Sequence, residues 1–163
     1  MSTILGLSTP AFTILHVIIS LVGIVSGVVV VIAMIGRKWL EGWTVVFLVT
    51  TVATSVTGFM FHSASFGPPH VVGVISLVVL IVACLALYGR RLAGLWRAIY
   101  IVSAVLALYL NVFVGVVQAF QKLAFLQPLA PTQSEPPFQI AQLIVLVVFV
   151  ALGVLAVRRF HPR

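Results

Sequence analysis

Five long apolar segments, separated by short polar connections, constrain the fold of this chain more than any other feature. Hydrophobic residues make up 63% of the 163 residues and charged residues 7%, whereas soluble domains are about 45–50% apolar and about 25% charged. Because about 20 apolar residues suffice to cross the hydrocarbon of a bilayer, the sequence predicts an all-α membrane protein built as a five-transmembrane-helix bundle. The spans are expected at about residues 11–35, 43–61, 71–88, 98–120 and 140–157.

The whole chain, residues 1–163, is expected to form a single polytopic membrane domain. The first span is longer than the apolar core of a signal peptide and has no basic residues before it, so we expect it to stay in the mature protein. The longest connection is the proline-rich segment 121–139. We interpret it either as a semi-rigid connector or as a lid over the outer ends of the helices.

The basic residues predict how the bundle lies in its membrane. With five spans, eight of the nine lysines and arginines fall on one side and only Lys122 falls on the other. The positive-inside rule places the eight in the cytoplasm, with the N-terminus outside and the C-terminus inside. We therefore interpret the net charge of +7 as a topology signal and not as a nucleic-acid patch. The eight are Arg37, Lys38, Arg90, Arg91, Arg97, Arg158, Arg159 and Arg163.

Histidines supply the candidate site. Three of the four, His16, His62 and His70, fall at similar depth near the outer side, whereas His161 lies in the cytoplasmic tail. Ionisable side chains inside membrane spans are rare and by default suggest function, and His16 lies within a span between apolar neighbours. Imidazole nitrogen is a ligand for zinc, copper and iron. The three histidines therefore predict a transition-metal site, or axial ligation of haem.

Other polar side chains approach the same level and are expected to line the pocket or to support its ligands. Those in the fourth span recur at helical spacing and share one face. The set is Asn111, Gln118, Gln121, Glu135 and Gln142. Helix packing explains part of this pattern, because small residues such as Gly23 and Gly27 allow helices to approach closely in lipid.

The scarcity of acidic residues excludes several kinds of chemistry. The chain has no Asp, and its only carboxylates are Glu41 and Glu135. A paired-carboxylate site, a calcium or magnesium cage and a Ser-His-Asp triad cannot be built from this set. Cys84 is the only cysteine, which excludes an intrachain disulfide and a thiol relay. We therefore favour a non-catalytic protein.

Several stretches resemble those of small predicted membrane proteins of bacteria, a family without an established activity. The stretches are "ILH" in the first span, "TGF" in the second, "PPHVVG" opening the third, "ALYLNVFVGVVQAF" in the fourth and "LAPTQSEPPF" after it. The resemblance covers nearly the whole chain. It implies a location in the bacterial cytoplasmic (inner) membrane, and it supplies no catalytic residues.

Three classes of function stay open. The leading hypothesis is a protein that binds a transition metal (zinc or copper) or haem at its outer face, for metal handling or electron transfer. The alternatives are a channel or carrier for a small solute, along the polar stripe of Asn111, Gln118 and Thr51, and a structural or lipid-binding subunit of a larger complex. The lipid bilayer is the expected partner, and association into a homo-oligomer or a larger membrane complex stays open.

Overall fold

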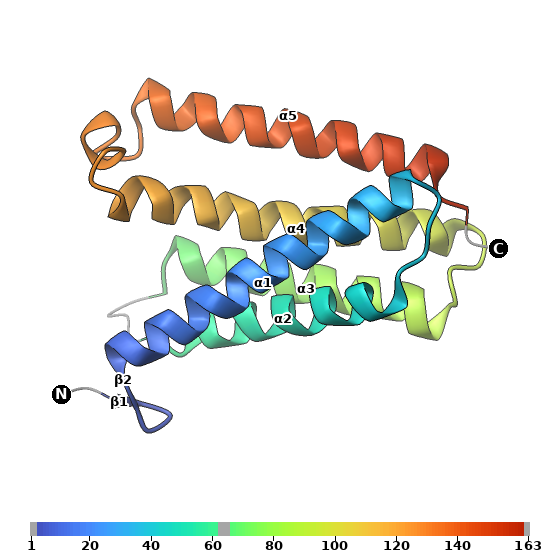
Figure 1. The fold of residues 1–163 in the computed structure, drawn as a ribbon, viewed down its shortest axis with the longest axis horizontal. Helices are drawn as coiled ribbons and strands as arrows, with labels where there is room; N and C mark the ends of the chain where they lie inside the picture. The colour runs from blue at the N-terminus through green and yellow to red at the C-terminus, as the bar shows by residue number, and fades with distance from the viewer. Residues whose placement is uncertain (1–2, 62–65, 162–163) are drawn as a thin grey trace.

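The computed structural model describes residues 3–61 and 66–161, and within them it is helical apart from a short hairpin. The five α-helices (Figure 1) are α1 (Thr9–Ile35), α2 (Glu41–Phe59), α3 (Pro68–Cys84), α4 (Leu95–Lys122) and α5 (Pro136–Arg159). A π-helical turn, η1 (Leu85–Gly89), continues α3, and a 3-10 turn, η2 (Gln127–Leu129), lies between α4 and α5. Strands β1 (Thr3–Ile4) and β2 (Leu7–Ser8) pair antiparallel before α1.

All five helices are long and apolar enough to cross a membrane, which confirms the number of spans predicted from the sequence. The third of these spans includes both α3 and η1. Helix α2 is the least apolar, with a mean hydropathy of 1.5 over its best window, against 2.2 to 3.0 for the others. The most polar wall of the bundle is therefore expected along α2.

Prolines begin two of the helices, which corrects the predicted boundaries. The prolines at 68 and 69 form the first turn of α3, so His70 lies inside a helix and not at the end of a loop. Those at 136 and 137 form the first turn of α5, so the connection after α4 ends at Glu135. Proline suits this position because the backbone N–H groups of the first turn have no partner within the helix, so the N–H that proline lacks is not needed there.

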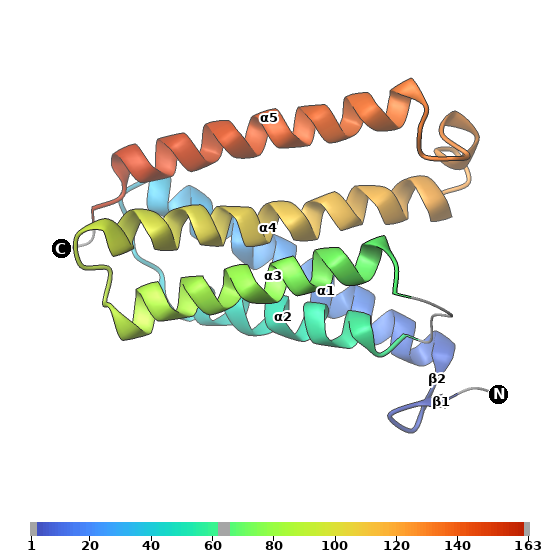
Figure 2. The same cartoon turned by 180° about the vertical axis from the view of Figure 1, so that it is seen from behind.

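Helices α1 to α4 form a ring, and α5 lies outside it (Figures 1 and 2). Around the ring, α1 contacts α2, α2 contacts α3, α3 contacts α4, and α4 contacts α1. Helix α5 packs along α4 and against α1. Only 11% of its most apolar window is buried, so most of its apolar side chains are exposed on the outside of the bundle.

Dense packing fills one half of the ring. Phe47 of α2 and Tyr100, Ile101 and Leu108 of α4 are completely buried there. Gly27 of α1 permits this packing, because a Cβ on it would lie 2.6 Å from Cδ1 of Leu108 and 2.8 Å from Cε2 of Phe47. Close approach through small residues is how helices associate in lipid, and Gly27 serves that purpose here.

The two ends of the bundle differ in charge. One end carries the turns after α1 and η1 and the end of α5, and we call it the arginine end because every described arginine lies there. Lys122 lies at the opposite end, with the β1–β2 hairpin and the α4–α5 connection; we call this the His16 end. The partition of charge expected from the sequence holds for the described residues, and Arg163 lies outside them. Which end faces the cytoplasm stays a prediction.

Candidate functional site: a cavity at the His16 end

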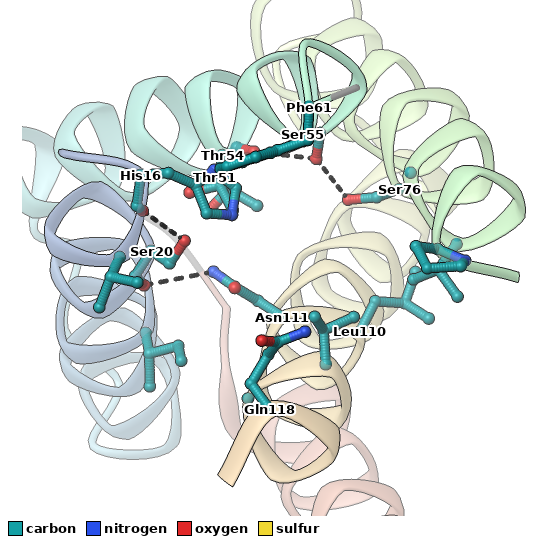
Figure 3. A pocket seen from close by; sticks show the side chains of 18 of the residues that line it. His16, Ser20, Thr51, Thr54, Ser55, Phe61, Ser76, Leu110, Asn111 and Gln118 are labelled. Atoms are coloured by element: carbon teal, nitrogen blue, oxygen red, sulfur yellow. Dashed lines mark hydrogen bonds between the residues drawn. The ribbon is translucent and has the colours of Figure 1, made fainter. Parts of the chain in front are cut away.

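A cavity of about 780 Å³ lies inside the ring at the His16 end (Figure 3). All four ring helices line it, and no described residue of α5 does. Its wall is mainly apolar and carries a limited number of polar groups from different helices. These are Thr13, His16 and Ser20 on α1, Thr51, Thr54 and Ser55 on α2, His70 and Ser76 on α3, and Asn111, Gln118 and Lys122 on α4.

The inner end of the cavity is closed. Thr51 and Asn111 line it, whereas Phe47 and Leu108, about one helical turn deeper, are completely buried in the core. Gly23 of α1 lets Asn111 reach across the ring, since a Cβ there would lie 3.1 Å from Nδ2 of Asn111. The cavity therefore ends against packed side chains and does not continue to the arginine end.

His16 presents an unprotonated nitrogen to its surroundings. Its Nδ1 lies 2.7 Å from Oγ1 of Thr57 on α2. The Thr57 hydroxyl donates its only proton to the carbonyl oxygen of Ala53, at 2.7 Å, so it accepts a hydrogen bond from Nδ1–H of His16. In the neutral ring, Nε2 of His16 then carries a lone pair and acts as an acceptor or a metal ligand.

His70 has the opposite arrangement. The backbone N–H of Gly67 donates to Nδ1 of His70 at 3.1 Å, so Nδ1 is unprotonated and Nε2 carries the hydrogen of the neutral ring. The ring also stacks on Phe66, with centroids 5.1 Å apart. His70 therefore lines the cavity with its Nδ1 engaged by the start of its own helix.

The hydroxyl groups on α1 and α2 bond mainly to their own helices. Ser20 donates to the carbonyl oxygen of His16 at 2.7 Å, and Thr51 donates to that of Phe47 at 2.6 Å. Besides the bond between Thr57 and His16, one bond crosses between helices, joining the hydroxyls of Ser55 and Ser76 at 3.0 Å. Because these protons are used within the protein, the oxygens face the cavity mainly as acceptors.

Thr54 is the exception. The residue lines the cavity, but its hydroxyl oxygen is buried and has no hydrogen-bond partner among the described residues. Buried polar atoms almost always have a partner, because leaving one unpaired costs about 1–3 kcal/mol.

Three of the predicted pocket residues are not in this cavity. Glu135 binds the backbone N–H groups of Thr132 and Ser134 in the α4–α5 connection. Gln142 lies on α5, and its Nε2 donates to the carbonyl oxygen of Phe113 on α4 at 3.1 Å. Gln121 is exposed and does not line the cavity. The structure therefore brings together His16, His70, Asn111 and Gln118 from the predicted set.

The metal hypothesis gains no support from this arrangement. No group of three or more His, Cys, Asp or Glu side chains that could hold a metal ion occurs among the described residues. His62, the third predicted ligand, lies outside the described residues. Of the three predicted ligands, the structure thus describes only His16 and His70, and Nδ1 of His70 already accepts a hydrogen bond from Gly67.

Thr54, Thr57 and Ser76 are the residues that sequence reasoning missed. Hydroxyl residues are frequent on α2 over positions 50–57, and this span has the lowest hydropathy of the five. That signal could have identified α2 as the polar wall. It could not have shown that Thr57 meets His16, because that contact joins two different helices.

The fold and the cavity together define a class: an α-helical bundle that, over the described residues, has five helices able to span a membrane and a ligand-sized cavity inside four of them. Comparison adds no family to this class, since no family model, no curated protein and no solved structure matches the chain. Function is therefore inferred from the chemistry of the site.

Proposed function

We propose that the protein binds a small, largely apolar organic molecule with a hydrogen-bonding head group in the cavity at the His16 end. Ligand pockets typically measure about 300–1,000 Å³ and combine an apolar wall with a few placed polar groups; this cavity of about 780 Å³ has both properties. The observation that carries the proposal is this combination in one cavity, with polar side chains from all four ring helices set in a mainly apolar wall.

The polar groups of the wall define the head group. His16 offers a lone pair on Nε2, and the side-chain amides of Asn111 and Gln118 both donate and accept. Asn111 extends from α4 towards α1, where Nδ2 lies 3.5 Å from the carbonyl oxygen of Ser20 (Figure 3). A head group that both donates and accepts hydrogen bonds, such as a hydroxyl beside a carbonyl, matches these partners.

The charge of the lining restricts the ligand further. Lys122 lines the cavity at its mouth beside Gln118, and no acidic residue is among the lining residues of the described chain. An amine or other cation would find no counter-charge there. A neutral or acidic head group is favoured instead.

Two earlier hypotheses rank lower. Haem or a metal ion keeps one supporting observation, the lone pair on Nε2 of His16. An open channel is disfavoured because buried Phe47 and Leu108 close the inner end of the cavity. A carrier would need a second conformation in which these side chains separate.

A cavity-filling variant tests the proposal. Gly115 lines the cavity on α4, and a Cβ there would meet only Cδ1 of Ile24 at 3.8 Å, an ordinary contact. Gly115→Leu should therefore fill the cavity while keeping the bundle stable, since leucine favours a helix over glycine by nearly 1 kcal/mol. Gly42→Leu on α2 is the matched control, because open space surrounds Gly42 at the arginine end.

The measurement uses the full chain in lipid nanodiscs, with 1-naphthol, an apolar ring with one hydroxyl, as the probe. We expect saturable binding and a raised melting temperature for the wild type and Gly42→Leu, and about tenfold weaker binding for Gly115→Leu. Equal, non-saturable partitioning into all three proteins would contradict the proposal. A visible absorption band or stoichiometric metal that disappears in His16→Ala would instead support the haem or metal hypothesis.

A further inference from the structure

A second hollow, of about 980 Å³, lies at the arginine end, at the other end of the bundle from the cavity. Three separate parts of the chain form it, and each contributes arginine. The turn after α1 supplies Arg37, the turn after η1 supplies Arg91, and the end of α5 supplies Arg158 and Arg159. The hollow therefore collects cationic groups that are far apart in the sequence.

The positive charge of this hollow is not balanced by acidic residues in its described lining. All four arginines are exposed, and no acidic residue is among the described residues that line it. Like charges that converge repel one another, and the repulsion is relieved when an anion joins them. Guanidinium groups bind phosphate oxygens through paired, charge-assisted hydrogen bonds.

Two of these arginines also have a backbone conformation that is unfavourable for residues other than glycine. Arg37 has φ = 60° and Arg91 has φ = 48°, both in the left-handed region. At the end of α1, Lys38 N–H bonds to the carbonyl oxygen of Ala33, and Arg37 N–H bonds to that of Met34. This is the Schellman arrangement, in which glycine usually occupies the position of Arg37. A non-glycine residue in such a conformation suggests a function for its side chain.

Membrane topology alone does not explain this arrangement. The positive-inside rule is satisfied by lysine as well as by arginine, at any place in the loops. Here the lining of a single hollow contains four arginines and no lysine among the described residues. Trp39 lines the same hollow, and tryptophan is typical of the level at which a membrane meets water.

From these observations we propose that the hollow at the arginine end binds the phosphate group of an anionic lipid. The arginines hold the phosphate, and the apolar side chains beside them, Trp39 and Leu87, accompany the lipid towards the bilayer. The position fits a lipid, because the hollow lies where five membrane-spanning helices end. Free phosphate shares the same chemistry and is distinguished by experiment. This site is separate from the cavity at the His16 end and stands without it.

The test uses substitutions that suit the backbone. Arg37→Gly with Arg91→Gly removes two charges and places glycine at two left-handed positions, so the double variant should melt at or above the wild-type temperature. The matched control, Lys38→Gln with Arg90→Gln, removes two charges from the same two turns, at residues that do not line the hollow. Arg90 lies over the ring of Trp96 instead, at 5.1 Å.

Native mass spectrometry then counts bound lipid on the full chain, with phosphatidylglycerol and phosphatidylcholine of identical acyl chains as probes. We expect the wild type and the control to bind one phosphatidylglycerol at least about tenfold more tightly than phosphatidylcholine, and the glycine double variant to lose this preference. Equal affinity of the wild type for both lipids, or equal loss in the control, would overturn the proposal. If inorganic phosphate stabilises the wild type while phosphatidylglycerol shows no preference, the ligand is a free anion and the assignment to a lipid is wrong.

Discussion

The imidazole of His16 owes its orientation to Thr57, which lies on a neighbouring helix. The bond from Nδ1 to the Thr57 hydroxyl joins α1 to α2 and leaves Nε2 as an acceptor. Phe61 supports the ring from one side, edge to face, with centroids 5.2 Å apart. An imidazole inside a membrane span needs such a partner, because an unpaired buried polar group is costly.

Thr57→Val tests this contact. Valine keeps the shape of threonine but leaves Nδ1–H of His16 without an acceptor, so we expect the free energy of unfolding to fall by about 1 kcal/mol. The measurement is reversible unfolding in mixed detergent micelles. Thr50→Val is the control, because the Thr50 hydroxyl bonds only to carbonyls of its own helix, and a near-neutral effect is expected. If both variants lose the same stability, the bond to His16 contributes nothing of its own.

At the scale of elements, the position of α5 depends on contacts at its two ends. It lies outside the ring and buries little surface. At the arginine end, Arg97 of α4 donates to the carbonyl oxygens of Val157, at 2.9 Å, and of Phe160. These carbonyls end α5 and have no partner within the helix. At the other end, Glu135 precedes the first turn and orders the connection from α4.

Arg97→Met should loosen the docking of α5. Methionine keeps much of the packing of the arginine stem but leaves the two carbonyl oxygens without their charged donor, at a cost of about 2 kcal/mol. We expect faster hydrogen exchange at the end of α5 than in the wild type. Arg158→Met is the control, since Arg158 is exposed. Unchanged exchange in Arg97→Met would show that other contacts hold α5 in place.

Glu135 predicts a pH dependence of the α4–α5 connection. Desolvation raises its pKa, but hydrogen bonds from the Thr132 hydroxyl and from the backbone N–H groups of Thr132 and Ser134 outweigh this and lower the pKa below its ordinary value of 4.5. The folded state therefore binds the proton more weakly than the unfolded state. Its contribution to stability is complete above 4.5 and is lost as the pH falls through the lowered pKa.

The expected result is a fall in melting temperature between about pH 5 and about pH 3, with part of it absent in Glu135→Gln. Glutamine is neutral throughout this range, so its profile lacks the contribution of the carboxylate. Identical profiles for the two proteins would show that the carboxylate does not stabilise the connection.

At the scale of the whole molecule, the bundle is asymmetric along its axis. The half near the arginine end is densely packed around Tyr100 and Ile101, and the half near the His16 end holds the cavity. Gly27 allows close packing in the first half, whereas Gly58 and Gly115 line the cavity in the second. The packed half closes the base of the cavity.

The asymmetry of charge predicts the orientation of the molecule. A reporter fused after Arg163 should be cytoplasmic, and a reporter inserted between η2 and α5 should be external, because basic loops stay inside. Alkaline phosphatase and a fluorescent protein serve as paired reporters, since each is active on one side only. The reverse pattern would place the cavity on the cytoplasmic side and the arginine hollow outside.

The sequence could single out unusual side chains but not how they assemble. His16 stood out because an imidazole between apolar neighbours in a span is unusual; the structure places it beside the cavity, and its role stays a prediction. Gln142 was expected in the same pocket but bonds to α4 from outside the ring. A polar residue in a span shows that a partner exists, but it does not show which neighbouring helix supplies it.

Hydropathy and charge by themselves therefore determined the number of spans, their approximate bounds and the gathering of basic residues at one end. These properties are sums over neighbouring residues and need no knowledge of contacts. Only the tertiary structure decided that α5 lies outside the ring, that α1 to α4 enclose a cavity, and that Thr57 sets the tautomer of His16. Each of these depends on which helix packs against which, and small residues on one face of every span permit several such arrangements.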